Sequence, residues 1–124
     1  MRPLRQVEII NHSRGTVLGT SISVADSAMS RLVGLLGKSR LGPGTGLLIN
    51  PSSGVHTFGM RFPIDVVALD RGLRVRGVWE AVRPWRIAAL SLQTCMVLEL
   101  PTGVIRASRT QIADDLEVAS KVPL

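Results

Sequence analysis

The chain has 124 residues, 45% of them hydrophobic and 19% charged, with a formal net charge of +6. This length suits one domain over residues 1–124 with a single core, and the apolar content excludes a disordered chain. The basic residues are scattered and aromatic residues make up only 3%, so the composition argues against a nucleic-acid partner.

Cysteine and histidine are too few for several common sites. The one cysteine, Cys95, excludes an internal disulfide, and the two histidines form no metal-ligand cluster with it. We therefore expect neither a metal nor a cofactor. The first residues lack the apolar region of a signal peptide, and no run approaches the length of a membrane span. We expect a cytoplasmic domain without a membrane span.

The first half of the chain predicts strands around one helix. Residues 7–10 and 16–24 flank a turn-rich segment and predict a hairpin. Residues 26–36 then place apolar side chains at spacings of three and four, after an aspartate that can cap a helix. Gly37 is suited to end that helix, and after a glycine-rich loop residues 46–50 predict a short strand.

The second half predicts a clear hairpin and a last set of short elements. Residues 64–69 form an apolar run, residues 73–80 alternate, and Asp70-Arg71-Gly72 between them predicts a tight turn. Residues 82–93 predict a connection, and residues 94–100 a buried strand. Residues 104–108 predict a short helical turn, and residues 116–119 a final strand.

Together these patterns predict a mainly β domain, at the margin of the α+β class. About seven short strands, joined without regular βαβ alternation, favour an antiparallel sandwich or barrel-like domain with one appended α-helix.

Two acidic residues interrupt strands that are otherwise apolar. Asp65 lies in the strand of residues 64–69, and Glu99 lies in the strand of residues 94–100. A buried, ionised carboxylate costs several kcal/mol, on the order of 3–5, unless it is paired or hydrogen-bonded. Each residue therefore either faces solvent or has a partner, and Arg61 and Arg31 are the plausible cations. A carboxyl group in an apolar pocket would instead have a raised pKa and could act as an acid or base.

The densest group of unusual residues is the segment 55–70, which precedes and includes Asp65. His56 could titrate near neutrality, although a lone histidine beside a turn is more often a surface residue. Phe58, Met60 and Phe62 alternate with a period of two, which is typical of core packing and also of a ligand wall. The candidate ligand-binding residues are Arg31, His56, Phe58, Met60, Arg61, Asp65 and Glu99; no catalytic residue is assigned.

Two blocks of the chain resemble one known family. They read Phe58-Gly59-Met60-Arg61-Phe62-Pro63-Ile64-Asp65 and Leu98-Glu99-Leu100-Pro101-Thr102-Gly103. These blocks resemble the DUF192 family, also called UPF0127, and the resemblance runs from about Arg14 to Val118. Ala113-Asp114 stands where the family usually has Gly-Asp, and Gly59 and Phe62 stand where many members have Trp and Asn. The resemblance implies a small, β-rich, sandwich-like domain with a helix, and it implies no reaction.

Three functional hypotheses remain open. The leading one is a small binding or accessory module for an unknown small molecule or protein. In it, Phe58 and Met60 form an apolar wall, while Asp65 and Glu99 hold arginine side chains that bind an anionic group. The second is a small hydrolase or isomerase that uses Asp65 or Glu99 as acid or base with His56. The third is a protein–protein interaction module with Trp79 and Trp85 as exposed anchors.

Overall fold

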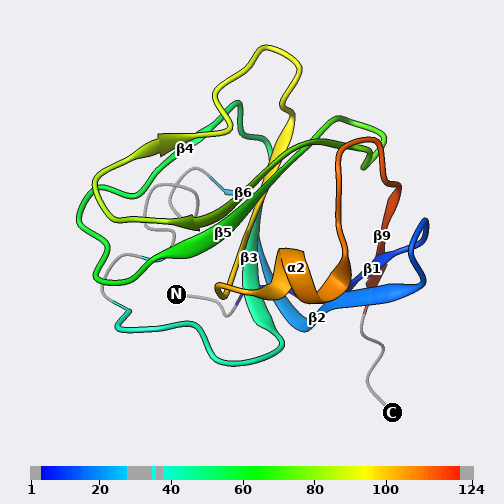
Figure 1. Ribbon diagram of the computed structural model, residues 1–124, viewed down its shortest axis with the longest axis horizontal. Helices are drawn as coiled ribbons and strands as arrows, with labels where there is room; N and C mark the ends of the chain where they lie inside the picture. The colour runs from blue at the N-terminus through cyan, green and yellow to red at the C-terminus, as the bar shows by residue number, and fades with distance from the viewer. Residues whose placement is uncertain (1–3, 28–34, 36–37, 121–124) are drawn as a thin grey trace.

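A curled sheet of seven strands forms the centre of the molecule (Figure 1). This is seen in a computed structural model that describes residues 4–27, 35 and 38–120. Most of the helix predicted for residues 26–36 lies outside the described residues. The elements are β1 (Gln6–Asn11), β2 (Thr16–Ala25), β3 (Thr45–Ile49), β4 (Val55–His56), β5 (Ile64–Leu69), β6 (Val75–Val82), β7 (Ile87–Ala88), β8 (Met96–Leu100), α2 (Val104–Ser108) and β9 (Leu116–Ser120).

The sheet is mixed, so the prediction of an antiparallel domain is correct only in part. Its strand order is β6-β5-β8-β3-β2-β1-β9, and β2 and β3 pair in parallel whereas the other neighbours are antiparallel. Parallel neighbours need a crossover connection, and residues 26–44 supply one between these two strands. The predicted hairpins β1–β2 and β5–β6 are confirmed.

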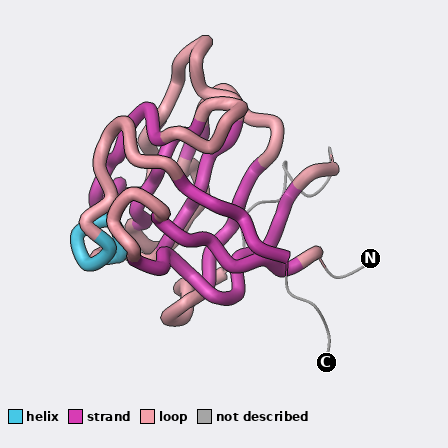
Figure 2. The backbone as a smooth tube through the Cα atoms, turned by 90° about the vertical axis from the view of Figure 1, so that its right-hand side faces the viewer, coloured by secondary structure: helices cyan, strands magenta, loops and turns pink. Residues whose placement is uncertain are grey.

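The sheet curls into a half-barrel whose two edge strands meet at one end. Arg74 and Asp115 form an isolated antiparallel bridge, and the Val75 amide donates to the Asp114 carbonyl at 2.8 Å. Farther along, the short helix α2 lies across the opening and contacts both β2 and β6 (Figure 2). The helical turn predicted for residues 104–108 is therefore confirmed.

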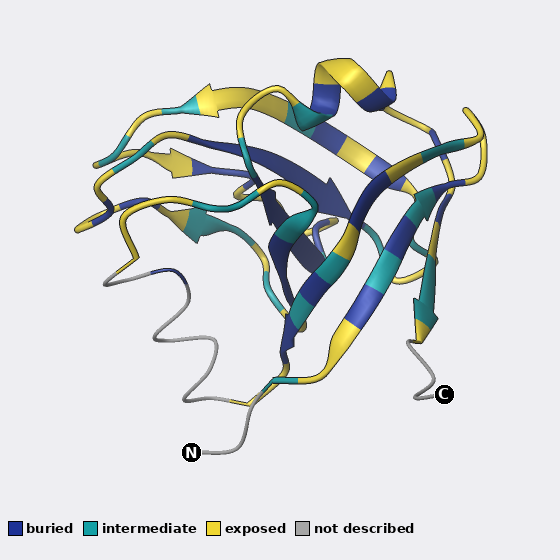
Figure 3. Ribbon diagram, turned by 90° about the horizontal axis from the view of Figure 1, so that it is seen from below, coloured by how far each residue is buried: buried dark blue, intermediate teal, exposed yellow. Residues whose placement is uncertain are grey.

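Both faces of the sheet are covered, which explains the unbroken burial of its central strands (Figure 3). The inner face holds a cluster that includes Val7, Leu98 and Ile105 of α2. The outer face of β3, β5 and β8 holds a second cluster that includes Val66 and Val97. Because side chains alternate along a strand, each central strand supplies both clusters.

A small second sheet covers part of the outer face. It consists of β4 and β7, paired antiparallel with Val55 opposite Ala88 and His56 opposite Ile87. The pattern of residues 82–93 predicts a connection, so the sequence does not indicate β7. No helix among the described residues is long and apolar enough to cross a membrane.

Candidate functional site

Asp65 is completely buried on the inner face and is bound by backbone amides. Its Oδ1 accepts a hydrogen bond from the Ala81 amide at 2.9 Å, and its Oδ2 accepts from the amides of Gly103 at 3.1 Å and Ile105 at 3.0 Å. The latter two amides lie at the start of α2, where helical N–H groups lack partners within the helix. Asp65 therefore caps α2 from a neighbouring strand and joins it to β6.

This geometry gives Asp65 a different partner from the one predicted. The ion pairs among the described residues do not include Asp65 with Arg61, whose side chain is exposed. Arg31, the other predicted cation, lies outside the described residues. The amides supply the hydrogen bonds that the buried carboxylate requires, so Asp65 has a structural role in this arrangement.

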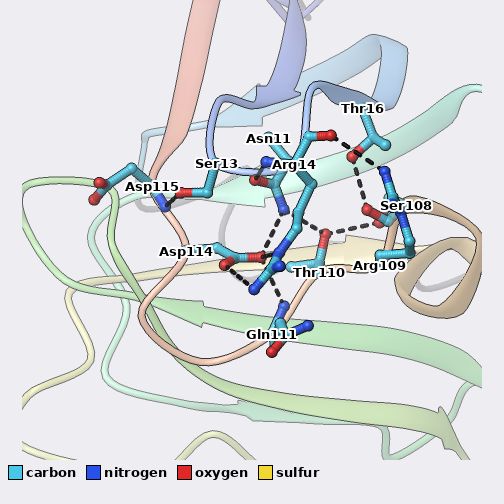
Figure 4. A network of polar contacts seen from close by, with 10 residues as sticks. All are labelled: Asn11, Ser13, Arg14, Thr16, Ser108, Arg109, Thr110, Gln111, Asp114 and Asp115. Atoms are coloured by element: carbon cyan, nitrogen blue, oxygen red, sulfur yellow. Dashed lines mark hydrogen bonds and ion pairs between the residues drawn. The ribbon is translucent and has the colours of Figure 1, made fainter.

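A second buried carboxylate, Asp114, lies at the end of the half-barrel where the edge strands meet (Figure 4). Its Oδ2 accepts hydrogen bonds from Asn11 at 3.0 Å, from Arg14 Nε at 3.1 Å and from the Gln111 amide at 3.0 Å. Arg14 also pairs with Oδ1 at 3.1 Å. Burial alone would raise the pKa of Asp114, but the bonds from Arg14, Asn11 and Gln111 outweigh it and lower that pKa.

Glu99 differs from both aspartates because one oxygen of its carboxyl group, Oε2, has no hydrogen-bond partner among the described residues. The residue is 4% exposed, and no hydrogen-bond donor of the described residues reaches its Oε2. It lies on the outer face of β8, with Val66 opposite it on β5 and Leu47 opposite it on β3. Desolvation by these surroundings raises the pKa of Glu99 from an ordinary 4.5 to about 7.

A cavity lies on the same face of the sheet, and Glu99 is one strand away from it, behind the lining residue Leu47. Its volume is about 470 Å³, and its wall includes Leu47, the direct cross-strand neighbour of Glu99. Directly opposed side chains of an antiparallel pair have Cβ atoms about 5 Å apart. Leu35 and Leu41 add apolar surface to the wall, while Lys38 and Arg40 add positive charge.

The aromatic residues of the predicted block do not form one wall. Met60 is buried in the outer-face cluster and Phe62 packs partly against it, whereas Phe58 is 41% exposed. Phe58 instead stacks on Trp85, with ring centroids 5.8 Å apart and an interplanar angle of 24°. The exposed His56 ring lies 5.0 Å from the Phe58 ring. The predicted residues therefore separate into a buried set, which packs in the outer-face cluster, and an exposed set.

Both tryptophans of the third hypothesis are partly exposed. Trp85 is 65% exposed, and Trp79 is 38% exposed with its indole over Gly77. A Cβ atom added at Gly77 would lie 2.4 Å from the Trp79 ring, so glycine is what allows this ring to lie against the strand. Exposure of both residues keeps the interaction-module hypothesis open.

The sequence did not indicate Thr57 as a positioning residue. Its buried hydroxyl donates to the Arg83 carbonyl at 2.7 Å and accepts from the Arg86 amide at 2.9 Å. Its carbonyl accepts from the Trp85 amide at 3.0 Å. Thr57 thus fixes the loop before β7 against the end of β4, which holds Phe58 beside Trp85. The general preference of threonine for β-strands gives no signal of this role, because the partners of Thr57 are far away in sequence.

Metal binding finds no support in the part of the chain that the structure describes, where no group of three or more His, Cys, Asp or Glu residues could hold an ion. Among those residues, His56 contacts Phe58 through its ring and accepts a hydrogen bond from the Phe58 amide, and it forms no ion pair with Glu99. The described geometry thus offers a buried acid whose cross-strand neighbour lines a cavity and, separately, an exposed aromatic surface.

The fold defines a small, mainly β domain, and its relatives place it in a family. The model of the DUF192 family, described as uncharacterised, matches residues 9–118, and the chain belongs to this family. A UPF0127 protein of Thermococcus sibiricus is 30% identical over 117 residues, which cover 88% of this chain and 73% of that protein. UPF0127 protein PH1112 of Pyrococcus horikoshii is 29% identical, covering 88% of this chain and 96% of that protein.

Two solved structures share the fold. A protein of unknown function from Novosphingobium aromaticivorans superposes with a TM-score of 0.76 at 19% identity, covering 90% of this chain and 83% of that one. A proposed transcription regulator from Sinorhizobium meliloti 1021 gives a TM-score of 0.77 at 19% identity, covering 95% of this chain and 97% of that one. At this identity the likeness concerns the fold alone.

Proposed function

We propose that this domain is a small binding module whose ligand site lies on the outer face of the sheet, beside Glu99. The observation that carries the proposal is the buried Glu99 Oε2, which no hydrogen-bond donor of the described residues reaches. Leaving such a group unsatisfied costs about 1–3 kcal/mol or more, so a ligand donor at this position would recover free energy. Asp65 and Asp114 have no such need because protein donors already bind them.

The cavity beside Leu47 indicates the chemistry of the ligand. An amino group would donate to Glu99, and because the pKa of Glu99 is about 7, binding a cation would also favour its ionised form. Lys38 and Arg40 would attract an anionic group, and the leucines of the wall would contact an apolar side chain. An apolar amino acid is the smallest common molecule that carries an amino group, an anionic carboxylate and an apolar side chain.

Thermal unfolding with matched probes tests this function. We expect L-leucine to raise the unfolding temperature of the wild-type protein, whereas 3-methylbutylamine and 4-methylpentanoate, which each lack one charged group, act more weakly. A ligand at ten times its Kd stabilises by about 1.4 kcal/mol. The Glu99→Gln variant should lose this response, and Glu117→Gln, at an exposed position of β9, should keep it. Equal responses of the wild type and Glu99→Gln would refute the proposal.

Acid–base catalysis by Glu99 is a second candidate, favoured by its pKa near neutrality. It requires a substrate that is chemically changed on the protein, which the binding proposal does not. Incubation of bound probe with the protein, followed by mass spectrometry, separates the two: recovery of unaltered probe supports binding alone. Turnover that is lost in Glu99→Gln would instead support the enzyme.

A further inference from the structure

Exposed aromatic and apolar side chains gather on the outer side of the two-stranded sheet. We call the side chains of His56, Phe58, Trp85 and Ile87 the lobe surface. His56 and Ile87 are opposite each other in the β4–β7 pair, and the Phe58 ring lies beside both the His56 ring and the Trp85 ring, with centroids 5.0 Å and 5.8 Å away. The opposite side carries Val55 and Ala88, which pack on the outer-face cluster. The loop that follows β7 rises from this region at the top of Figure 1.

The extent of exposure is unusual for side chains of this kind. Trp85 is 65% exposed and Ile87 is 62% exposed, while Leu90 and Leu92 in the following loop are 73% and 102% exposed. Contiguous apolar surface on a small domain is a marker of an interaction site, whereas single exposed residues are ordinary. The stack of Phe58 on Trp85 makes this surface contiguous.

The backbone holds this surface in place at a cost. Trp85 has φ 66°, in the left-handed region where a residue other than glycine is strained by about 1 kcal/mol. Thr57 compensates through its contacts with Arg83, Trp85 and Arg86. An outward-facing tryptophan held in a strained conformation by a buried threonine is a built feature, not a loose loop side chain.

The charged side chains of the two segments that carry the lobe surface have one sign. Residues 50–63 and 83–95, which include β4 and β7, contain no Asp or Glu, and they contain Arg61, Arg83 and Arg86. All three arginines are exposed, and none takes part in an ion pair among the described residues. Elsewhere in the described chain, Arg14, Arg74, Arg76 and Arg106 each pair with an acidic residue, whereas Arg5, Arg40, Arg71 and Arg109 take part in no ion pair among those residues. The lobe therefore differs from the rest of the chain by its lack of acidic residues.

We propose that the lobe surface is a docking site for an acidic segment of a partner protein that inserts an apolar or aromatic side chain. Tryptophan and arginine are the residues that most often carry the binding energy of protein interfaces. The acid-free rim complements a partner's carboxylates and would steer its approach. A protein is favoured over a nucleic acid because Phe58 and Trp85 cover one another's ring faces, which leaves less surface for base stacking. The proposal does not depend on Glu99.

Selection from a library of random short peptides displayed on phage tests the partner's chemistry. The wild-type protein is the bait, and the folded Trp85→Ala variant removes peptides that bind elsewhere. We expect the enriched peptides to combine Asp or Glu with Phe, Trp or Leu. Enrichment of basic peptides, or of peptides without excess acid, would overturn the proposal, as would the absence of any Trp85-dependent peptide.

Titration of an enriched peptide, followed by NMR at the Trp85 indole, then tests the site. We expect Trp85→Ala and the double variant Arg83→Glu/Arg86→Glu each to weaken binding about tenfold or more. Arg5→Glu, a charge reversal at an exposed position outside the lobe, should change it less than about twofold. The Trp79 indole serves as an internal reference that should not shift. Tighter binding of oligo-dT or of phosphatidylserine vesicles than of the peptide, or self-association through the lobe, would assign the surface to another partner and overturn the proposal.

Discussion

Asp65 and Glu99 lie on neighbouring strands in adjacent positions of one ladder, yet their surroundings are opposite. Asp65 pairs in register with Leu100, and Glu99 pairs with Val66, so the two carboxyl groups point to different faces of the sheet. On the inner face, three backbone amides bind Asp65. On the outer face, Glu99 is almost as deeply buried, at 4% exposed against 0% for Asp65, and its Oε2 has no donor among the described residues. Burial of an acid therefore does not indicate a ligand by itself; the proposed function rests on burial without donors.

The Asp114 network strengthens this comparison. Asp114 is also a buried carboxylate, at the end of the half-barrel where the edge strands meet. Its hydrogen-bond donors are Asn11, Arg14 and the Gln111 amide, all from the protein itself (Figure 4). Both buried aspartates connect segments that are distant in sequence. Asp65 connects α2 to β6, and Asp114 connects the turn after β1 to the loop before β9. On the outer face, the buried Glu99 Oε2 makes no such connection among the described residues.

Removal of Asp65 should have the largest effect on stability. Asp65→Ala leaves the amides of Ala81, Gly103 and Ile105 without their acceptor, so we expect a loss of about 3–5 kcal/mol in the free energy of unfolding. Urea denaturation measures it. The matched control is Asp115→Ala, which removes an exposed acid paired with Arg74 and should cost at most about 1 kcal/mol. Similar losses in the two variants would show that Asp65 does not hold α2.

Glu99 should make the domain less stable as the pH rises. Its pKa is about 7 in the folded protein and about 4.5 when unfolded, so the folded state holds more protons between these values. Stability from this residue is therefore complete below about pH 4.5, falls as the pH rises to about 7 and then levels off, with a total change on the order of 3 kcal/mol. Urea denaturation at closely spaced pH values measures this decline.

The Glu99→Gln variant sharpens the comparison with Asp65 because it removes the titration and keeps the shape. We expect its stability to lack the decline between pH 4.5 and 7 and to exceed that of the wild type at pH 8. Glu117→Gln, at an exposed position of β9, should leave the decline unchanged. A decline that persists in Glu99→Gln would assign it to another group.

The sequence predicted both acids as candidates but could not separate them. Each interrupts an apolar strand, and that pattern indicates burial. The donors that distinguish them come from residues 81, 103 and 105, and their position depends on the half-barrel and on α2. Likewise, alternation predicted the β5–β6 hairpin, whereas the parallel pairing of β2 with β3 depends on the crossover, for which the strand patterns carry no signal. The family resemblance indicated the sequence block that carries Phe58, Met60 and Asp65. Only the fold shows that Met60 is buried in the outer-face cluster while Phe58 is exposed and stacks on Trp85.

The smallest expected effect on stability concerns the strained turn at Ala113, next to Asp114, where the edge strands of the half-barrel meet. Ala113 has φ 77°, in the left-handed region, and it stands where the family pattern usually has glycine. Its amide donates to the Val75 carbonyl at 2.8 Å, so the turn retains its contacts despite the side chain. The unfavourable conformation costs alanine about 1–2 kcal/mol, and the greater freedom of unfolded glycine offsets part of the gain from replacing it.

We therefore expect Ala113→Gly to raise the free energy of unfolding by about 0.5–1 kcal/mol. The control is Ala107→Gly, at an exposed position within α2, where the same substitution should lower stability by about 1 kcal/mol because glycine is a poor helix former. The opposite signs separate backbone strain from the general effect of glycine. If both variants lose stability, the Asp114 network depends on the alanine side chain as well as on the turn, and strain at this end is smaller than its dihedral angle implies.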